Sequence, residues 1–529
     1  MSAPDISRRS AEGASPLDVL VVGGGINGVG LARDLAGRGL SVMLAEQDDL
    51  ASHTSSSSTK LIHGGLRYLE YYEFGLVRKA LAEREVLLRS APHIMWPLRF
   101  VMPHDPAMRP AWLIRAGLFL YDHLARRKLL PGSCCVDLHQ HEAGATLQPR
   151  FKRGFLYSDG WVDDARLVVL LAMDAAERGA QIRTRCRVTE VQRTGALWTA
   201  SLCHADGRVE QVSARVLVNA TGPWASQFLQ DCARMAKPRP LRLIKGSHVV
   251  VPKMFAHDHA YIFQNADRRI IFAIPYEQDF TLIGTTDLEY RGKIGQAHID
   301  SSEMAYLCEQ ASRYFKKPVK AQDVVWSYSG VRPLLDEGDG TDASAVTRDY
   351  ELEVDRNGAP LMSIWGGKIT TFRKLAEEAA DQVCALLGQD RPSWTADAVL
   401  PGGDFTNWGV ANALQTSGKP ALDKEAARRF PAVPETVRRR WLRSYGTRMT
   451  QLLAEQALGD EVAPGVYEAE MHYLYHHEWA RCADDVLWRR SKLGLHLDAD
   501  ARAQVVRWCN RHWPALGGTT RHHDAHPRA

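Results

Sequence analysis

The stretch from Asp18 to Glu46 constrains the fold of this chain more than any other. It begins with a β-branched apolar run, passes through a glycine turn into a segment of helical periodicity, and ends in a second apolar run followed by an acid. This order predicts a βαβ unit. Gly23, Gly25 and Gly28 have the G-x-G-x-x-G spacing, which provides a tight turn, a close approach of backbone to a pyrophosphate, and packing of helix on strand. We therefore expect a dinucleotide-binding site here.

The residues that flank the glycine turn extend this prediction. The helix expected to begin near Ile26 and Asn27 would direct its free N–H groups at the phosphates. Glu46 lies 23 residues beyond Gly23, where a carboxylate can accept hydrogen bonds from an adenosine ribose. An acid at this position favours a free 2′-hydroxyl. A purely structural glycine turn is the alternative, and the complete βαβ unit argues against it.

Length and composition set the broad class of the protein. At 529 residues the chain exceeds a single core, so two or three domains are expected. Its 66 basic and 62 acidic residues are too evenly balanced for a nucleic-acid-binding protein. The 9 cysteines form no C-x-x-C pair, which indicates a reduced, cytoplasmic compartment, and no metal is expected, since the histidines of the tail (His522, His523, His526) are interpreted as a frayed terminus. The first 17 residues do not resemble a signal peptide, and no apolar run of 18 or more residues could span a bilayer.

The sequence between Arg187 and Val218 distinguishes FAD from NAD. Three stretches of alternating hydrophobicity, separated by turn residues, predict a small β-meander there. The meander ends in an apolar run followed by Thr221-Gly222, which returns the chain to the first glycine turn in FAD-binding folds. NAD-binding domains have no need of such a return, so FAD is favoured.

The Ser/Thr-rich segment ASHTSSSSTKLIHGGLRY, from Ala51 to Tyr68, offers hydroxyl and backbone donors beside the dinucleotide fold. From this segment onward the chain resembles the FAD-dependent glycerol-3-phosphate dehydrogenases of the respiratory, membrane-associated bacterial type. The resemblance covers nearly the whole chain. Its further motifs are RPAWLIRAGLFLYDHL (109–124), YSDGWVDDARLV (157–168), VNATGPW (218–224), RLIKGSH (242–248), IGTTD (283–287), YSGVRPL (328–334) and WGGKITTFRKLAE (365–377).

Together with the apolar periodicity, the resemblance implies an α/β fold with three parts. The first is a discontinuous, Rossmann-like FAD-binding domain at 18–72, 150–238 and 331–388, and the second is an antiparallel-sheet substrate domain at 73–149 and 239–330. The third is an all-helical C-terminal cap at 389–517. The termini, 1–17 and 518–529, are expected to be flexible.

FAD is expected to be bound tightly and without a covalent link, because no His or Cys lies in a flavin-linking context. The glycine turn, the Ser/Thr segment, the return and the second Gly-Gly pair supply the expected contacts. These cofactor-binding residues are Gly23, Gly25, Ile26, Asn27, Gly28, Glu46, Thr54, Ser55, Ser56, Ser58, Lys60, Leu61, Ile62, His63, Val188, Thr221, Gly222, Gly367 and Lys368.

Oxidation of a secondary alcohol phosphate needs a cationic clamp for the dianion, a base for the hydroxyl proton, and a hydride acceptor, which flavin N5 supplies. The candidates for the clamp are Arg67, Arg332 and Lys368, each near a glycine that lets backbone approach a ligand. Tyr68 and Thr370 are expected to contact the substrate as well. The candidates for the base are His63, in LIHGG, and His248, in KGSH. Arg332 could also stabilise the developing alkoxide.

The resemblance implies oxidation of sn-glycerol 3-phosphate to dihydroxyacetone phosphate, with electrons passed to ubiquinone or menaquinone. An oxidase that reduces oxygen to hydrogen peroxide, and a flavin-binding scaffold without turnover, are the alternatives. A homodimer is expected, peripherally bound to the anionic lipid surface at the inner face of the cytoplasmic membrane.

The segment near 103–130 is the expected membrane contact. Its helix combines apolar and aromatic residues with cations that could meet anionic head groups. A core helix with a basic end is the alternative, and the cluster Arg438, Arg439 and Arg440 is a weaker second candidate. The apolar members are Trp112, Leu113, Leu118, Phe119 and Leu120, and the cations are Arg109, Arg115, Arg126, Arg127 and Lys128.

Overall fold

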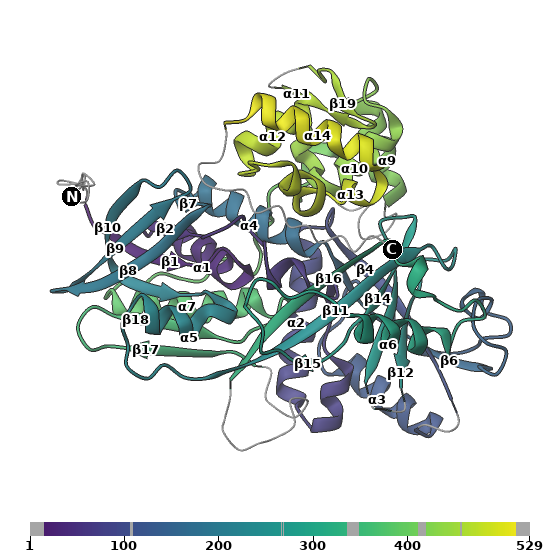
Figure 1. Cartoon of the computed structure of the whole chain (residues 1–529). Helices are drawn as coiled ribbons and strands as arrows, with labels where there is room; N and C mark the ends of the chain where they lie inside the picture. Colours follow the sequence, from purple (N-terminus) through teal and green to yellow (C-terminus); the bar gives the residue numbers. More distant parts are fainter. Residues whose placement is uncertain are drawn as a thin grey trace.

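The computed structural model describes residues 15–105, 109–265, 267, 269–335, 349–410, 419–454 and 457–514. The expected flexible N-terminus lies almost wholly outside these residues, and the tail with His522, His523 and His526 lies wholly outside them. The described chain forms two large β-sheets side by side, with a helical C-terminal domain packed against them (Figure 1).

The first sheet has the strand order β17-β18-β10-β1-β2-β7, in which only β17 runs antiparallel to its neighbour. β8 and β9 continue from β10 as the predicted antiparallel meander. The strands are β1 (Leu17–Val22), β2 (Val42–Ala45), β7 (Gln181–Arg183), β8 (Cys186–Thr194), β9 (Leu197–His204), β10 (Val209–Asn219), β17 (Glu351–Asp355) and β18 (Leu361–Trp365).

Both faces of β1 are buried, which explains its continuous apolar sequence. Val19 and Val21 join the hydrophobic core formed with three helices, α1 (Ile26–Gly37), α4 (Asp164–Glu177) and α7 (Phe372–Leu386). Leu20 and Val22 join a second core with the meander and α5 (Ala225–Asp231). The carboxyl end of β1 is therefore fixed from both sides.

The second sheet has the order β15-β11-β14-β13-β12-β4-β6-β3, with β16 added to β11 and β5 to β6. It is antiparallel as predicted, except that β4 and β12 run parallel. Helix α6 (Ser301–Ser312) packs in the core of one face, and α2 (Phe74–Ser90) and α3 (Ala111–His123) in that of the other. The strands are β3 (Leu61–Ile62), β4 (Met95–Pro103), β5 (Cys134–Asp137), β6 (Arg153–Val162), β11 (Leu241–Pro252), β12 (Ala260–Gln264), β13 (Ile270–Tyr276), β14 (Phe280–Gly284), β15 (Leu288–Glu289) and β16 (Trp326–Leu335).

The strand pairing shifts the predicted domain boundaries. β3 and β6 lie within the ranges 18–72 and 150–238 predicted for the FAD-binding domain, yet both pair within the second sheet. β16 crosses the predicted boundary at 331 and pairs with β11 along its whole length. The prediction is wrong for these strands, because an apolar pattern shows that a segment is a strand but does not show which partner it pairs with.

The C-terminal domain consists mainly of helices, with one short hairpin in which β19 (Glu461–Ala463) pairs with β20 (Val466–Tyr467). The prediction of an all-helical cap is wrong in that detail, because Gly465, at φ +72°, turns the chain into a hairpin. The helices are α9 (Lys419–Arg429), α10 (Glu435–Tyr445), α11 (Met449–Ala454), α12 (Glu468–His477), the π-helical segment η8 (Asp485–Arg490), α13 (Leu493–His496) and α14 (Ala499–His512). None of the described helices is long and apolar enough to cross a membrane.

Candidate active site

The glycine turn at the carboxyl end of β1 has the geometry that its sequence predicts. Gly23 has φ +114°, and a Cβ at this position would overlap the carbonyl oxygen of Ala220. A Cβ at Gly28 would overlap the carbonyl oxygen of Gly23, so only glycine lets α1 begin this close to the strand. The turn therefore leaves the N-terminus of α1 close behind β1, the arrangement that binds a pyrophosphate.

Two side chains hold the backbone around this turn. The amide of Ile26 donates to Ser55 Oγ at 2.9 Å, and the amide of Gly24 donates to Glu46 Oε2 at 2.6 Å. Asp48 N donates to the other oxygen, Glu46 Oε1, at 2.8 Å. Burial raises the pKa of the Glu46 carboxyl, although these two amides favour its charged form. Glu46 and Ser55 thus lie at the turn, as expected of residues that contact a dinucleotide.

The return of the chain to the glycine turn also has the predicted form. β10 runs parallel to β1, and its last residue, Asn219, pairs with Val22. Beyond it, Thr221 Oγ1 donates to Asn219 Oδ1 at 2.7 Å, and Gly222 has φ +57°. Val188 is buried in the same core as Val22, at the end of β1.

A second glycine pair, Gly366-Gly367, directly follows β18 and lies beside Asn27 in the first turn of α1. Gly366 and Gly367 have φ of +69° and +97°, and Asn27 Nδ2 donates to the carbonyl oxygen of Gly366 at 3.1 Å. A Cβ on Gly367 would lie 2.9 Å from that nitrogen. Asn27 Oδ1 is buried and has no hydrogen-bond partner among the described residues. Buried polar atoms are normally satisfied, so a glycine cradle beside an orphaned acceptor fits a bound group with donors, such as FAD.

The Ser/Thr-rich segment links the two sheets. Thr54 Oγ1 donates to the carbonyl oxygen of Val331 at 2.7 Å, and Ser58 Oγ donates to Asp164 Oδ2 at 2.7 Å. Lys60 is buried and forms an ion pair with Asp164 at 2.7 Å. Ser56 supplies a carbonyl oxygen to the Lys60 ammonium at 3.0 Å, and Leu61 and Ile62 form β3. The cofactor contacts predicted for this segment remain predictions. The structure shows that the segment holds β16 and α4 together through these hydrogen bonds and this ion pair.

His248 is held in a fixed orientation on β11. Its Nε2 lies 3.0 Å from Thr59 Oγ1, and its ring stacks on Tyr328 at 4.7 Å between centroids. Burial, together with the charges of Lys60 and Arg332, holds the pKa of His248 well below its usual range, which favours the neutral form of the imidazole. Its Nδ1 is buried with no hydrogen-bond partner among the described residues.

Arg332 lies on β16 opposite Ile244 of β11. One guanidinium nitrogen lies 3.3 Å from both the carbonyl oxygen of Thr286 and Asp287 Oδ1, and the side chain is 35% exposed. The guanidinium is close enough to His248 to lower the pKa of that imidazole. Because the side chain is partly exposed, an anionic ligand could reach the guanidinium.

The other predicted substrate residues gather at the end of β3. The amide of His63 donates to Thr370 Oγ1 at 3.2 Å, and Lys368 Nζ lies 3.9 Å from the centroid of the Tyr68 ring. Arg67 is directed to Tyr71, with a hydrogen bond of 3.2 Å to its hydroxyl.

The two groups of candidate residues are joined by one short segment. Thr59, which contacts His248, precedes His63 by four residues, so their Cα atoms lie at most about 14 Å apart. A small phosphorylated alcohol and a flavin ring could therefore meet residues of both groups.

Sequence reasoning misses three residues that organise this region. Thr59 and Tyr328 orient His248, and Asp164 neutralises Lys60 and fixes Ser58. From the sequence, Asp164 is only an acid favoured at a helix N-terminus, but its place in a conspicuous DD pair is a usable signal. The contacts of Thr59 and Tyr328 depend on strand pairing and leave no local signal.

A Rossmann-like domain with a second glycine cradle, attached to a β-sheet that carries polar and cationic residues, is the arrangement expected of a flavin-dependent oxidoreductase. Comparison with known families agrees. The family model of the FAD-dependent oxidoreductases matches residues 18–373, and that of the C-terminal domain of alpha-glycerophosphate oxidase matches residues 393–511. The chain belongs to the FAD-dependent oxidoreductase family, and FAD is its cofactor.

Individual relatives narrow the class further. The chain is 50% identical over 511 residues to a glycerol-3-phosphate dehydrogenase of Pseudomonas aeruginosa, covering 96% of this chain and 97% of the relative. It is 49% identical to a D-erythritol 1-phosphate dehydrogenase of Brucella abortus, covering 93% and 97%. Among solved structures, that of the glycerol-3-phosphate dehydrogenase from Bacillus halodurans complexed with FAD has a TM-score of 0.74 at 26% identity, covering 94% of this chain and 90% of that one.

Proposed function

We propose that the protein oxidises the secondary alcohol of sn-glycerol 3-phosphate to dihydroxyacetone phosphate and passes the electrons to ubiquinone or menaquinone. The observation that carries this proposal is that the paired strands β11 and β16 hold a buried imidazole, His248, and a partly exposed guanidinium, Arg332, close enough for the charge of Arg332 to lower the pKa of His248. Oxidation of a phosphorylated alcohol needs a cation to bind the phosphate and a base to accept the hydroxyl proton. The names of the relatives support the same substrate class.

When bound, the flavin accepts the hydride at N5. Arg332 and Lys368 are proposed to bind the phosphate dianion, and Tyr68, Arg67 and Thr370 to orient the substrate near His63. Because Arg332 is one cause of the low pKa of His248, a bound dianion would offset that charge and make the imidazole a better base when the substrate is present.

Anaerobic addition of sn-glycerol 3-phosphate to the FAD-loaded protein tests the reaction, since hydride transfer bleaches the flavin absorbance. D-erythritol 1-phosphate is a second candidate substrate, because the Brucella relative is as similar as the glycerol-3-phosphate dehydrogenases, and the same titration compares the two. A stoichiometric yield of peroxide in air would identify an oxidase instead. If neither phosphate bleaches the flavin, a scaffold role replaces the proposed oxidation.

His63→Ala and His248→Ala should separate the two candidate bases. We expect His63→Ala to slow flavin reduction by about 100-fold or more while it changes the substrate dissociation constant little, as for a base that acts in the transition state. Stopped-flow absorbance gives both quantities. If His248→Ala has that effect and His63→Ala does not, the base is His248, and the acidic limb of kcat/KM should then lie below the ordinary imidazole value of about 6.5 because burial lowers its pKa.

The membrane contact proposed for this protein is the outer face of α3. Only Leu118, Tyr121 and Asp122 of that helix are buried, whereas Trp112 is 72% and Phe119 is 56% exposed. This exposure argues against a core helix. The helix lies at the end of the molecule away from the C-terminal domain (Figure 1).

The cations of this segment divide into two kinds. Arg126 and Lys128 are exposed, while Arg127 donates from Nε to the carbonyl oxygen of Asp122 at 3.0 Å. In the second candidate cluster, the arginines at 438–440, two side chains form ion pairs within the C-terminal domain. Arg440 pairs with Glu470, and Arg439 pairs with Glu435. We therefore propose α3 with Arg126 and Lys128 as the surface that meets the inner face of the cytoplasmic membrane; the homodimer remains a prediction.

Replacing Trp112 and Phe119 by Ser, and Arg126 and Lys128 by Glu, should release the protein from anionic vesicles and lower activity with a quinone. Activity with a soluble dye should persist, because none of these side chains belongs to the proposed active site. Vesicle co-sedimentation and the two assays measure these effects. A control with Ser at Val209 and Val399, which are 46% and 41% exposed elsewhere, should behave like the wild type. If the variant with all four replacements still binds the vesicles, the membrane contact lies elsewhere.

A further inference from the structure

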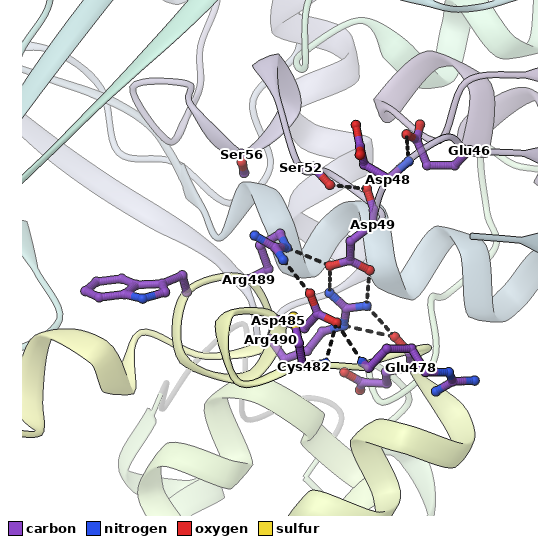
Figure 2. A network of polar contacts seen from close by, with 12 residues as sticks. Glu46, Asp48, Asp49, Ser52, Ser56, Glu478, Cys482, Asp485, Arg489 and Arg490 are labelled. Atoms are coloured by element: carbon purple, nitrogen blue, oxygen red, sulfur yellow. Dashed lines mark hydrogen bonds and ion pairs between the residues drawn. The ribbon is translucent and has the colours of Figure 1, made fainter. Parts of the chain in front are cut away.

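The loop that follows β2 is fastened to the C-terminal domain by a buried carboxylate. Asp49 is 3% exposed, and its two oxygens accept from Nη1 and Nη2 of Arg490 at 2.6 and 2.7 Å (Figure 2). Arg489 Nε donates to the same carboxylate at 2.6 Å. Both arginines lie in η8, more than 430 residues further along the chain. Burial opposes ionisation of Asp49, but the charges of Arg490 and Arg489 hold its pKa well below its usual range.

A third arginine joins the same two parts of the molecule. Arg185 follows β7, and its amide donates to the carbonyl oxygen of Asp48 at 2.8 Å. Its guanidinium donates to Asp485 of η8 at 2.7 and 2.9 Å. Asp485 is fully buried and also accepts from Arg489. The loop is thus held to the C-terminal domain through both its side chains and its backbone.

The same loop begins beside Glu46, the carboxylate that is predicted to bind the adenosine ribose of FAD. Asp48 N and Gly24 N both donate to Glu46, and Ala51 N lies 3.4 Å from the carbonyl oxygen of Gly24. Ala51 has φ +57°, a conformation that is unfavourable for an L-residue and needs support from its surroundings. Asp49 lies between Glu46 and Ala51, so the arginines hold the loop at its centre. Figure 2 shows Glu46, Asp48 and Asp49 on one stretch of chain that faces η8.

We propose that the C-terminal domain positions the adenosine end of FAD, with Arg490 as the positioning residue that acts through Asp49. Arg490 itself is completely buried and touches the Asp49 carboxylate and the carbonyl oxygen of Glu478. Its effect on the cofactor is therefore indirect, by fixing the loop that carries Glu46 and leads to Ser55. The proposal concerns FAD binding alone and does not depend on which phosphate is oxidised.

The test compares Arg490→Met with a matched control, Arg440→Met. Arg440 also forms an arginine–carboxylate pair, with the buried Glu470, and its own side chain is 20% exposed, but both residues belong to the C-terminal domain. The FAD dissociation constant of each apoprotein is measured by flavin fluorescence. We expect the constant of Arg490→Met to rise about 5- to 150-fold, the range of a typical coupling between two sites, and that of Arg440→Met to stay within twofold. ADP, used as a probe of the adenosine end, should lose affinity in the same proportion as FAD.

Linkage provides a second readout that a merely structural role would not change. If docking of η8 favours FAD, then FAD must favour docking of η8, so hydrogen exchange in residues 485–490 should be slower in the FAD-loaded protein than in the apoprotein. Arg490→Met should remove this difference. If that variant does not fold, Arg489→Met, whose side chain is 18% exposed, replaces it. An unchanged FAD affinity in the folded variant, an equal loss in Arg440→Met, or FAD-independent exchange would overturn the proposal.

Discussion

Replacing Arg332 by Ala should lower kcat/KM for sn-glycerol 3-phosphate by more than about 100-fold while the purified protein keeps its FAD. A hydrogen bond to a charged group contributes about 1.5 to 3 kcal/mol, so loss of a two-pronged contact with the dianion removes about 3 kcal/mol or more. At about 1.4 kcal/mol per tenfold, that loss gives a factor of at least 100. FAD should stay bound, because Arg332 is held by Thr286 and Asp287 rather than by the glycine turn. Steady-state kinetics with a dye acceptor and the flavin-to-protein absorbance ratio measure both effects.

Two further variants sharpen this result. Arg332→Lys keeps the charge but not the planar fork, so it should recover only part of the activity. Arg291→Ala removes an arginine that is 86% exposed and pairs with nearby Glu289, and it should leave kcat/KM unchanged. A loss of less than tenfold in Arg332→Ala at normal flavin content would remove Arg332 from the phosphate site.

Gly23→Val should yield a protein without FAD. The φ of +114° is strained for any residue with a Cβ, and that Cβ would overlap the backbone of Ala220, which cannot move without displacing β10 from β1. We expect a colourless protein with no dehydrogenase activity and a lowered Tm. Absorbance at the flavin band and thermal unfolding followed by circular dichroism measure these effects.

Gly75→Ala is the matched control for the glycine variant. Gly75 lies in the first turn of α2, where a Cβ would meet no atom of the surrounding protein within 4 Å. The Ala variant should therefore retain both FAD and Tm. If Gly23→Val still purifies with a full complement of flavin, the turn does not approach the pyrophosphate as closely as proposed.

Local signals suffice to predict the FAD-binding turn from the sequence. The glycine spacing, the apolar runs and the terminal acid all lie between Asp18 and Glu46, and the structure places β1, α1 and β2 at this range to within one residue. Gly23 and Gly28 show the close contacts for which glycine is expected. Such features can be predicted because each depends on the conformation of neighbouring residues.

Contacts between distant segments could not be predicted in the same way. His248 meets Thr59 across 189 residues, and Arg373, on α7, pairs with Glu83 across 290 residues. These contacts depend on the order of strands and helices in space, which an apolar pattern leaves open. The same limit applies to α3, because a Leu-rich amphipathic helix has one pattern whether its apolar face is buried in a core or exposed, and only the exposure of Trp112 and Phe119 in the structure distinguishes the two.

The distance in sequence between the parts of the FAD site has a consequence for biosynthesis. β1 and the glycine turn leave the ribosome first, β10 follows much later, and the cradle at Gly366 and Gly367 later still. A nascent chain therefore cannot enclose the cofactor until most of it has been made, and the partner of Asp49 emerges 441 residues after it. During that time the apolar strand β1 lacks some of its partners and is prone to aggregate. We therefore expect the nascent chain to depend most on chaperones before β18 has left the ribosome.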